Sequence, residues 1–173
     1  INEARKVASE RDLTIGSALI LGALARLQIA SGRLDEAAET IEGAKGEPYR
    51  ESWVLFRLPV HIADVEYMIR QGELGRATAA ANQLIKRLRK QGVRSELPEA
   101  LYLKGKALQD LGQRGAARKT YVDALSEARA MGTRRTLWRV LSALSLVEDD
   151  PSEASRLHEE ARHVIEYIAD RIG

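Results

Sequence analysis

Three glycines recur at a fixed interval, and this interval constrains the fold more than any other feature of the chain. Gly32, Gly72 and Gly112 are spaced 40 and 40 apart. At the fifth position after each glycine the chain has an alanine, at Ala37, Ala77 and Ala117. A period between about 20 and 50 residues indicates a protein built from stacked copies of one supersecondary unit. The sequence therefore predicts a repeat protein rather than one compact globule.

Each repeat has the same internal pattern, which is an apolar stretch, a short turn at the glycine and an Ala-rich amphipathic stretch. In the first repeat Leu21, Leu24 and Ala25 have the i, i+3, i+4 spacing of one helix face. A glycine suits the left-handed residue that closes many helices. Val, Ile and Thr are scattered rather than grouped, so we expect no strand. Each repeat is therefore predicted to be an antiparallel helical hairpin.

Prolines support most of these helix positions. Pro48, Pro98 and Pro151 lie near predicted helix starts, where a missing N–H costs little. Pro59 is different because it lies inside the predicted helix 50–71. That helix is expected to kink at Pro59 or to begin near it.

Four hairpins and a half-hairpin account for the chain. The fourth hairpin has a degenerate turn at 149–152, and the first residues match the junction before that hairpin at a constant offset of 124. We therefore expect an all-α superhelix, a solenoid of stacked antiparallel helical hairpins that was cut from a longer polypeptide. The predicted boundaries within this single domain are a half repeat at 1–12 and repeats at 13–46, 48–92, 95–132 and 133–173.

Composition and motifs argue against several classes of function. The absence of Cys excludes a disulfide scaffold, a Cys-type zinc site and thiol catalysis. A charge of 27 − 25 = +2 is too small to indicate nucleic-acid binding by itself. His158 and His163 are five positions apart and share no helix face, and no Gly-rich phosphate-binding motif occurs. We expect a non-enzymatic protein without a cofactor or metal, and no run of 18 apolar residues that could span a membrane.

At these residues the pattern resembles the tetratricopeptide repeat. The third repeat carries the family's large and small residues at Leu101, Gly105, Ala117, Tyr121 and Ala124. It departs from the family at Lys104, where a leucine is usual, and its repeats are longer, 40 against the usual 34. The resemblance implies a right-handed superhelix whose first helices line a concave groove that binds a protein or peptide.

The resemblance also indicates which side chains face that groove. Among them, Arg26, Tyr102, Lys106 and Arg139 could grip an acidic or extended peptide. The family's two-carboxylate clamp needs Lys and Asn, where this chain has Gly22 and Arg26, so a chaperone-tail receptor is not expected. The candidate groove residues are Arg26, Ile29, Ile62, Glu66, Arg70, Tyr102, Lys106, Gln109 and Arg139.

The Arg-, Ala-, Leu- and Glu-rich repeats also look like the helical-repeat regions of large bacterial signalling and transcription regulators that contain an ATPase module. This likeness implies a cytoplasmic regulatory scaffold that binds a protein, a peptide, or neighbouring domains of the same polypeptide, rather than nucleic acid or a membrane. Two alternatives stay open. The basic stretches 86–94 and 134–139 could bind nucleic acid or a small effector, and an exposed end of the solenoid could associate with a second copy.

Overall fold

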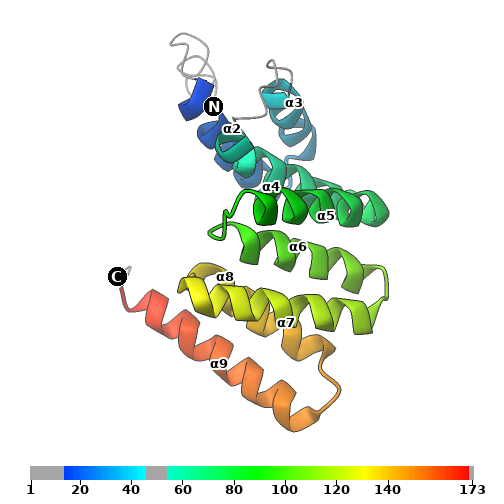
Figure 1. Ribbon diagram of the computed structural model, residues 1–173, viewed down its shortest axis with the longest axis vertical. Coiled ribbons are helices and arrows are strands. Elements are labelled where there is room, and N and C mark those ends of the chain that lie inside the picture. Colours follow the sequence, from blue (N-terminus) through cyan, green and yellow to red (C-terminus); the bar gives the residue numbers. More distant parts are fainter. Residues whose placement is uncertain (1–13, 46–53, 172–173) are drawn as a thin grey trace. The chain divides into compact units, whose positions relative to one another are not determined.

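The described part of the chain consists of helices joined by turns. The computed structural model of the protein describes residues 14–45 and 54–171, which form eight helices and no strand (Figure 1). The predicted half repeat at 1–12 and the helix start at Pro48 lie outside these residues. The helices belong to two compact units, residues 1–73 (unit 1) and 74–173 (unit 2). Unit 1 holds α2 (Thr14–Ala30), α3 (Leu34–Lys45) and α4 (Val54–Arg70); unit 2 holds α5 (Leu74–Lys90), α6 (Leu97–Asp110), α7 (Arg114–Met131), α8 (Arg134–Val147) and α9 (Pro151–Ala169).

Within each unit, helices that follow one another in the chain pack together. In unit 1, α2 packs against both α3 and α4, and in unit 2, α6 packs against α5, α7 and α8, while α8 packs against α7 and α9. These contacts confirm the predicted all-α class of stacked helical hairpins, the class of the α-α superhelices. The boundary between the units falls at the turn after α4, inside the predicted repeat 48–92.

The turns that separate the helices share one backbone conformation. At Gly32, the glycine N–H donates to the Ile29 carbonyl at 3.1 Å, and the Arg33 N–H donates to the Gln28 carbonyl at 2.9 Å. This pair of bonds is the Schellman motif, and its glycine takes a left-handed conformation that strains any residue with a Cβ. The same bonds recur, with φ between 64° and 76°, at Gly32, Gly72, Gly92, Gly112 and Gly132.

Prolines and one capping carboxylate mark two helix starts in unit 2. Pro98 lies in the first turn of α6, and Pro151 is the first residue of α9. An Asp150 carboxylate oxygen accepts a hydrogen bond from the Ser152 N–H at 2.9 Å, which satisfies one of the free donors of α9. Pro59 lies inside α4, and the helix continues on both sides of it.

Unit 1 depends on a very close approach between α2 and α4. A Cβ built on Gly22 would lie 2.5 Å from the Pro59 Cβ and 2.6 Å from the Pro59 carbonyl carbon. Only glycine leaves room for a helix backbone at this separation. Beside this contact, a buried cluster joins the three helices of the unit through Ala25, Ile41 and Ala63.

In unit 2, a glycine of α6, Gly105, leaves room for the large side chain of Tyr121 from α7. Tyr121 on α7 is completely buried, and a Cβ on Gly105 of α6 would overlap with its ring. The ring therefore occupies the space that a side chain at residue 105 would need. Ala117 and Ala124, one helical turn on either side of Tyr121, are also completely buried and let α7 lie close to its neighbours.

Candidate binding surfaces

The predicted groove residues of unit 1 divide between the core and the surface. Ile29 and Ile62 expose only 2 % and 3 % of their surface, so they belong to the core rather than to an open groove. Arg26 on α2 and Glu66 on α4 form an ion pair with 2.8 Å between Nε and Oε2. Arg70, at the end of α4, is exposed. The expectation that all five line an open groove is therefore wrong for the two isoleucines.

Helix packing explains this correction. Ile29 lies one turn after Ala25, on the α2 face that contributes Ala25 to the buried cluster with α3 and α4. Ile62 lies one turn after Pro59, on the α4 face that approaches Gly22. Both isoleucines thus lie one turn after residues at which the helices of unit 1 contact one another.

In unit 2, the predicted groove residues Tyr102 and Arg139 come together around a buried carboxylate. Glu99, in the first turn of α6, is 4 % exposed and accepts a 2.6 Å hydrogen bond from Arg139 Nη1 of α8. The Thr136 hydroxyl donates to the other Glu99 oxygen at 3.1 Å. The Arg139 guanidinium lies over the Tyr102 ring, 4.3 Å from its centroid. Together these contacts hold an Arg–Tyr stack between α6 and α8.

Two further predicted groove residues lie along the same face of α6 and also have partners inside the fold. Lys106 Nζ binds both carboxylate oxygens of Asp110, at 2.7 and 2.8 Å. The Gln109 side-chain oxygen accepts a 2.9 Å hydrogen bond from the buried Tyr121 hydroxyl. Burial raises the pKa of Tyr121 above its ordinary value, so this hydroxyl keeps its proton and acts as a donor.

The two basic stretches differ in how their charges are used. In the second stretch, Arg134 lies over the Tyr167 ring of α9, and Arg139 is paired as described above. At the end of the first stretch, Arg94 binds Glu127 of α7 at 2.7 Å. Lys86 and Arg89 of α5 instead line a pocket.

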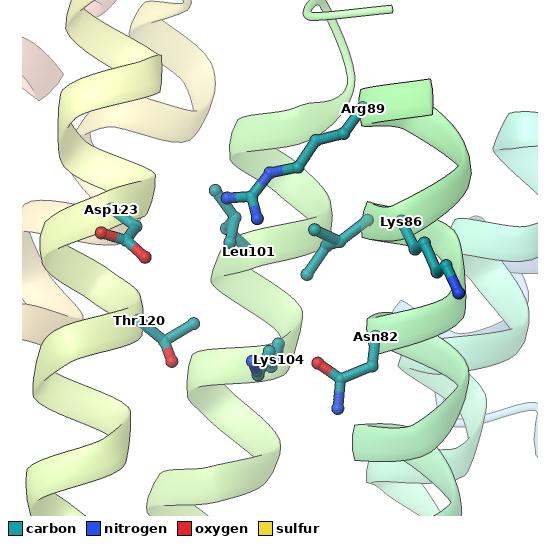
Figure 2. Close-up of a pocket in the computed structure, with 8 residues that line it drawn as sticks. Asn82, Lys86, Arg89, Leu101, Lys104, Thr120 and Asp123 are labelled. Atoms are coloured by element: carbon teal, nitrogen blue, oxygen red, sulfur yellow. The ribbon is translucent and has the colours of Figure 1, made fainter. Parts of the chain in front are cut away.

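This pocket lies between three consecutive helices of unit 2. It has a volume of about 280 Å³ and takes residues from α5, α6 and α7. In Figure 2, Arg89 extends from α5 toward α6 above Leu101, while Thr120 and Asp123 lie on α7 at the opposite side. The eight lining residues are Asn82, Ile85, Lys86, Arg89, Leu101, Lys104, Thr120 and Asp123.

Three of the corresponding positions of unit 1, one repeat earlier, hold a lysine paired with two carboxylates instead. Lys45 Nζ at the end of α3 lies 2.9 Å from an Asp64 oxygen of α4 and 3.0 Å from a Glu42 oxygen. Desolvation lowers the pKa of Lys45, but the hydrogen bonds to Asp64 and Glu42 outweigh it and raise the pKa above its ordinary value. Glu42, Lys45 and Asp64 correspond to Asn82, Ile85 and Lys104 of the pocket.

Several members of these clusters carry no recognisable signal in the sequence. Glu99 has the position of an ordinary first-turn carboxylate, and Asp123 and Thr120 carry no motif. Lys104 did have a signal, since it stands where the first and fourth repeats carry Leu24 and Leu141. A lysine at an apolar repeat position marks a place where the chain departs from its own pattern.

Two other kinds of site have no support within residues 14–45 and 54–171. In this part of the chain no three His, Asp or Glu side chains lie close enough together to hold a metal ion. Over the same residues, none of the helices combines the length and the apolar character that crossing a membrane requires.

Comparisons with known proteins support the fold alone. No protein-family model and no curated protein sequence matches the chain. One solved structure that it resembles is that of BtubC (BKLC) from P. vanneervenii, with a TM-score of 0.71 over 96 % of this chain and 69 % of that one. The two sequences are 16 % identical, so the likeness is one of helical arrangement.

Proposed function

We propose that this protein is a non-catalytic helical-repeat scaffold that binds a protein partner through the α6–α8 face of unit 2. This face is defined by Tyr102, Lys106, Gln109 and Arg139. The observation that carries the proposal is the Arg139–Tyr102 stack, which the buried Glu99 holds in place. Tyr and Arg are the residue types that most often dominate binding energy at protein interfaces.

The stack is already ordered without a partner, which favours binding. Arg139 is fixed by Glu99 at 2.6 Å and by the ring beneath it. A long side chain that is immobilised before association loses little further rotamer freedom on binding. The partner therefore meets a planar surface in its final geometry.

The charges of this face indicate what kind of segment it would accept. Arg139 and Lys106 already have carboxylate partners in Glu99 and Asp110. An acidic peptide would have to compete with both, so we favour a neutral, extended protein segment that places an apolar or planar side chain on the stack. Leu146, on α8 and 67 % exposed, offers an apolar contact on the same helix.

The wider role that we propose is that of a regulatory module in a larger bacterial signalling or transcription regulator. It is supported by the resemblance of the repeats to tetratricopeptide-like regions of such proteins. An isolated chain with this role should not hydrolyse ATP, and turnover above the blank would contradict it.

Photo-crosslinking tests the binding face. A crosslinking amino acid replaces Leu146 on α8 or, as a matched exposed control, Val122 on α7, which is 45 % exposed. A partner captured from position 146 alone is then purified, and its affinity is measured for the unmodified chain and for Tyr102→Ala. We expect Tyr102→Ala to weaken binding at least tenfold, because loss of an aromatic anchor commonly removes more than about 1.4 kcal/mol. An unchanged affinity would contradict the proposed face.

A further inference from the structure

The α5–α6–α7 pocket is built from regular stripes of side chains. Asn82, Ile85, Lys86 and Arg89 follow the i, i+3, i+4, i+7 spacing of a single helix face on α5. The pairs contributed by α6 and α7 likewise have the i, i+3 spacing. Three consecutive helices thus direct one face each toward the same 280 Å³ hollow. On α6 the lining residues occupy a different stripe from the α6–α8 face described above.

The charge of this hollow is not balanced within the fold. Lys86, Arg89 and Lys104 line it, against the single carboxylate of Asp123. None of these four side chains forms a hydrogen bond or ion pair with the described part of the chain. On α7 and α9, in contrast, several arginines have carboxylate partners, such as Arg129 with Glu160 at 2.6 Å.

Unit 1 has the pairing of a lysine with carboxylates that the pocket lacks. There, Lys45 bridges Asp64 and Glu42 at 2.9 and 3.0 Å, so its positive charge meets carboxylates of the same chain. At the matching positions of unit 2, Ile85 and Asn82 are neutral and Lys104 is cationic. The sequence of α5 contains no acidic residue that could neutralise Lys104.

We propose that this pocket binds the phosphate group of a small, hydroxyl-bearing phosphate monoester. Arg89 and Lys104 hold the phosphate oxygens through charge-assisted hydrogen bonds, and Lys86 adds positive charge at the rim. Asn82, Thr120 and Asp123 accept hydrogen bonds from ligand hydroxyls. Ile85 and Leu101 form an apolar wall for the ligand's carbon skeleton.

The surroundings of the pocket favour one phosphate over a polyanion. A nucleic acid needs a series of cations that track successive phosphates. Here the Asp123 carboxylate lies on the α7 side of the pocket, and one turn further along α7 the Glu127 carboxylate pairs with Arg94. A second phosphate would therefore meet a carboxylate instead of another pocket cation.

Calorimetric titration of the whole chain with glycerol 3-phosphate, inorganic phosphate and a single-stranded DNA oligonucleotide tests this proposal. We expect glycerol 3-phosphate to bind with a Kd of about 1 mM or tighter and more tightly than inorganic phosphate. Lys104→Leu should weaken glycerol 3-phosphate binding about tenfold, since it removes one charge-assisted hydrogen bond. It should keep the fold, because Leu24 and Leu141 stand at the equivalent positions.

Two further variants separate the pocket from general electrostatics. Lys119→Leu removes an exposed cation of α7 that does not line the pocket, and it should leave the affinity unchanged within about twofold. Asp123→Asn should tighten inorganic phosphate and reduce the preference for glycerol 3-phosphate, because it removes both a repulsive charge and a charged acceptor for hydroxyls.

Three results would overturn the proposal. The first is no heat with either phosphate compound up to about 10 mM, where even weak sites are occupied. The second is an equal loss of affinity in Lys104→Leu and Lys119→Leu. The third is tighter binding of the DNA oligonucleotide that weakens steeply with salt and is not displaced by glycerol 3-phosphate, which would assign the cations to nucleic acid. None of these results depends on Tyr102, so they leave the proposed partner-binding face to its own test.

Discussion

Units 1 and 2 are both built from packed antiparallel helices, but they carry different side chains at matching repeat positions. In unit 1, Lys45 lies between Asp64 and Glu42, and both carboxylates pair with its ammonium group. In unit 2, the matching place is a hollow in which Lys104 has no partner in the described chain. Repeat geometry therefore determines where side chains meet, whereas the individual residues decide whether that place serves stability or is available to a ligand.

The ion pairs between first helices show a second difference of this kind. Both pairs join residues one repeat apart, Arg26 with Glu66 in unit 1 and Arg139 with Glu99 in unit 2. The unit 1 side chains are 26 % and 24 % exposed, whereas those of unit 2 are 19 % and 6 % exposed. Since water screens charges less where they are buried, the two pairs should respond differently to the loss of a carboxylate.

The largest expected effect comes from removing that carboxylate charge in each unit. Glu99→Gln should lower the free energy of unfolding by about 3 kcal/mol, because it removes the countercharge that Glu99 gives to the mostly buried Arg139. Glu66→Gln should cost about 1 kcal/mol or less, as expected for a partly exposed pair. Urea denaturation of both variants measures the difference. Equal losses would remove this distinction between the units.

The two close-contact glycines give the next largest effect. Gly22→Ala and Gly105→Ala should each destabilise the protein by about 2 kcal/mol through overpacking. A second substitution, Tyr121→Leu, should relieve part of the Gly105→Ala strain, because the clash there is with a side chain. Gly22→Ala has no such rescue, since its neighbours include backbone atoms of Pro59 and Val60. A double-mutant cycle on residues 105 and 121 that shows no coupling would contradict this view.

Alkaline pH should weaken both units for different reasons. The pKa of Tyr121 is raised by burial, so the folded state keeps a proton that the unfolded chain loses above about pH 10. Stability is therefore complete below about pH 10 and falls as the pH rises, by about 1 kcal/mol at pH 11. The raised pKa of Lys45 acts in the same direction above its ordinary value of 10.5.

Thermal unfolding between about pH 8 and pH 11 separates the two contributions. Tyr121→Phe should flatten most of the alkaline decline, and Asp64→Asn should remove a smaller part, because Lys45 is partly exposed. A decline that is the same in Tyr121→Phe and the unmodified chain would show that the buried phenol is not its source.

The smallest stability change provides the most direct test of the comparison. Asn82→Glu places a carboxylate in the pocket at the position that corresponds to Glu42. It should stabilise the protein by about 0.5 kcal/mol by pairing with Lys104. The same variant should abolish binding of glycerol 3-phosphate. If the variant binds glycerol 3-phosphate as well as the unmodified chain does, the ligand does not occupy the pocket beside Asn82.

The interval between glycines made the helical hairpins predictable, because turn chemistry and apolar spacing are local properties of the chain. Ala37, Ala77 and Ala117, which the repeat analysis aligned, are all completely buried. Gly92 and Gly132 lie outside the 40-residue series, although each closes a helix with the same motif half a repeat after Gly72 or Gly112. The sequence does contain a signal for these two turns, because each glycine follows the preceding turn glycine at half of the 40-residue interval.

The chemistry of the surfaces was less accessible, since it depends on partners from distant helices. Glu99 looks like a solvated first-turn carboxylate in the sequence, but α8 covers it and supplies Arg139 and Thr136. The repeat pattern predicts Ile29 and Ile62 in an open groove, but the packing of unit 1 buries them. The periodicity of the sequence shows on which face of a helix a residue lies. Whether that face is buried, and which side chains it contacts, depends on the neighbouring helices.

The turns of unit 2 at Gly92, Gly112 and Gly132 follow one another at equal intervals along the chain. Each interval contains one helix, which crosses the unit once, so the chain returns to the same edge of the unit after two helices. Removing one interval here would reverse the direction of every later helix, whereas removing or duplicating two would restore it. An array of this kind can therefore be shortened or lengthened only by whole pairs of helices. The helical hairpin is thus the unit that can be deleted or duplicated, as well as the unit that packs.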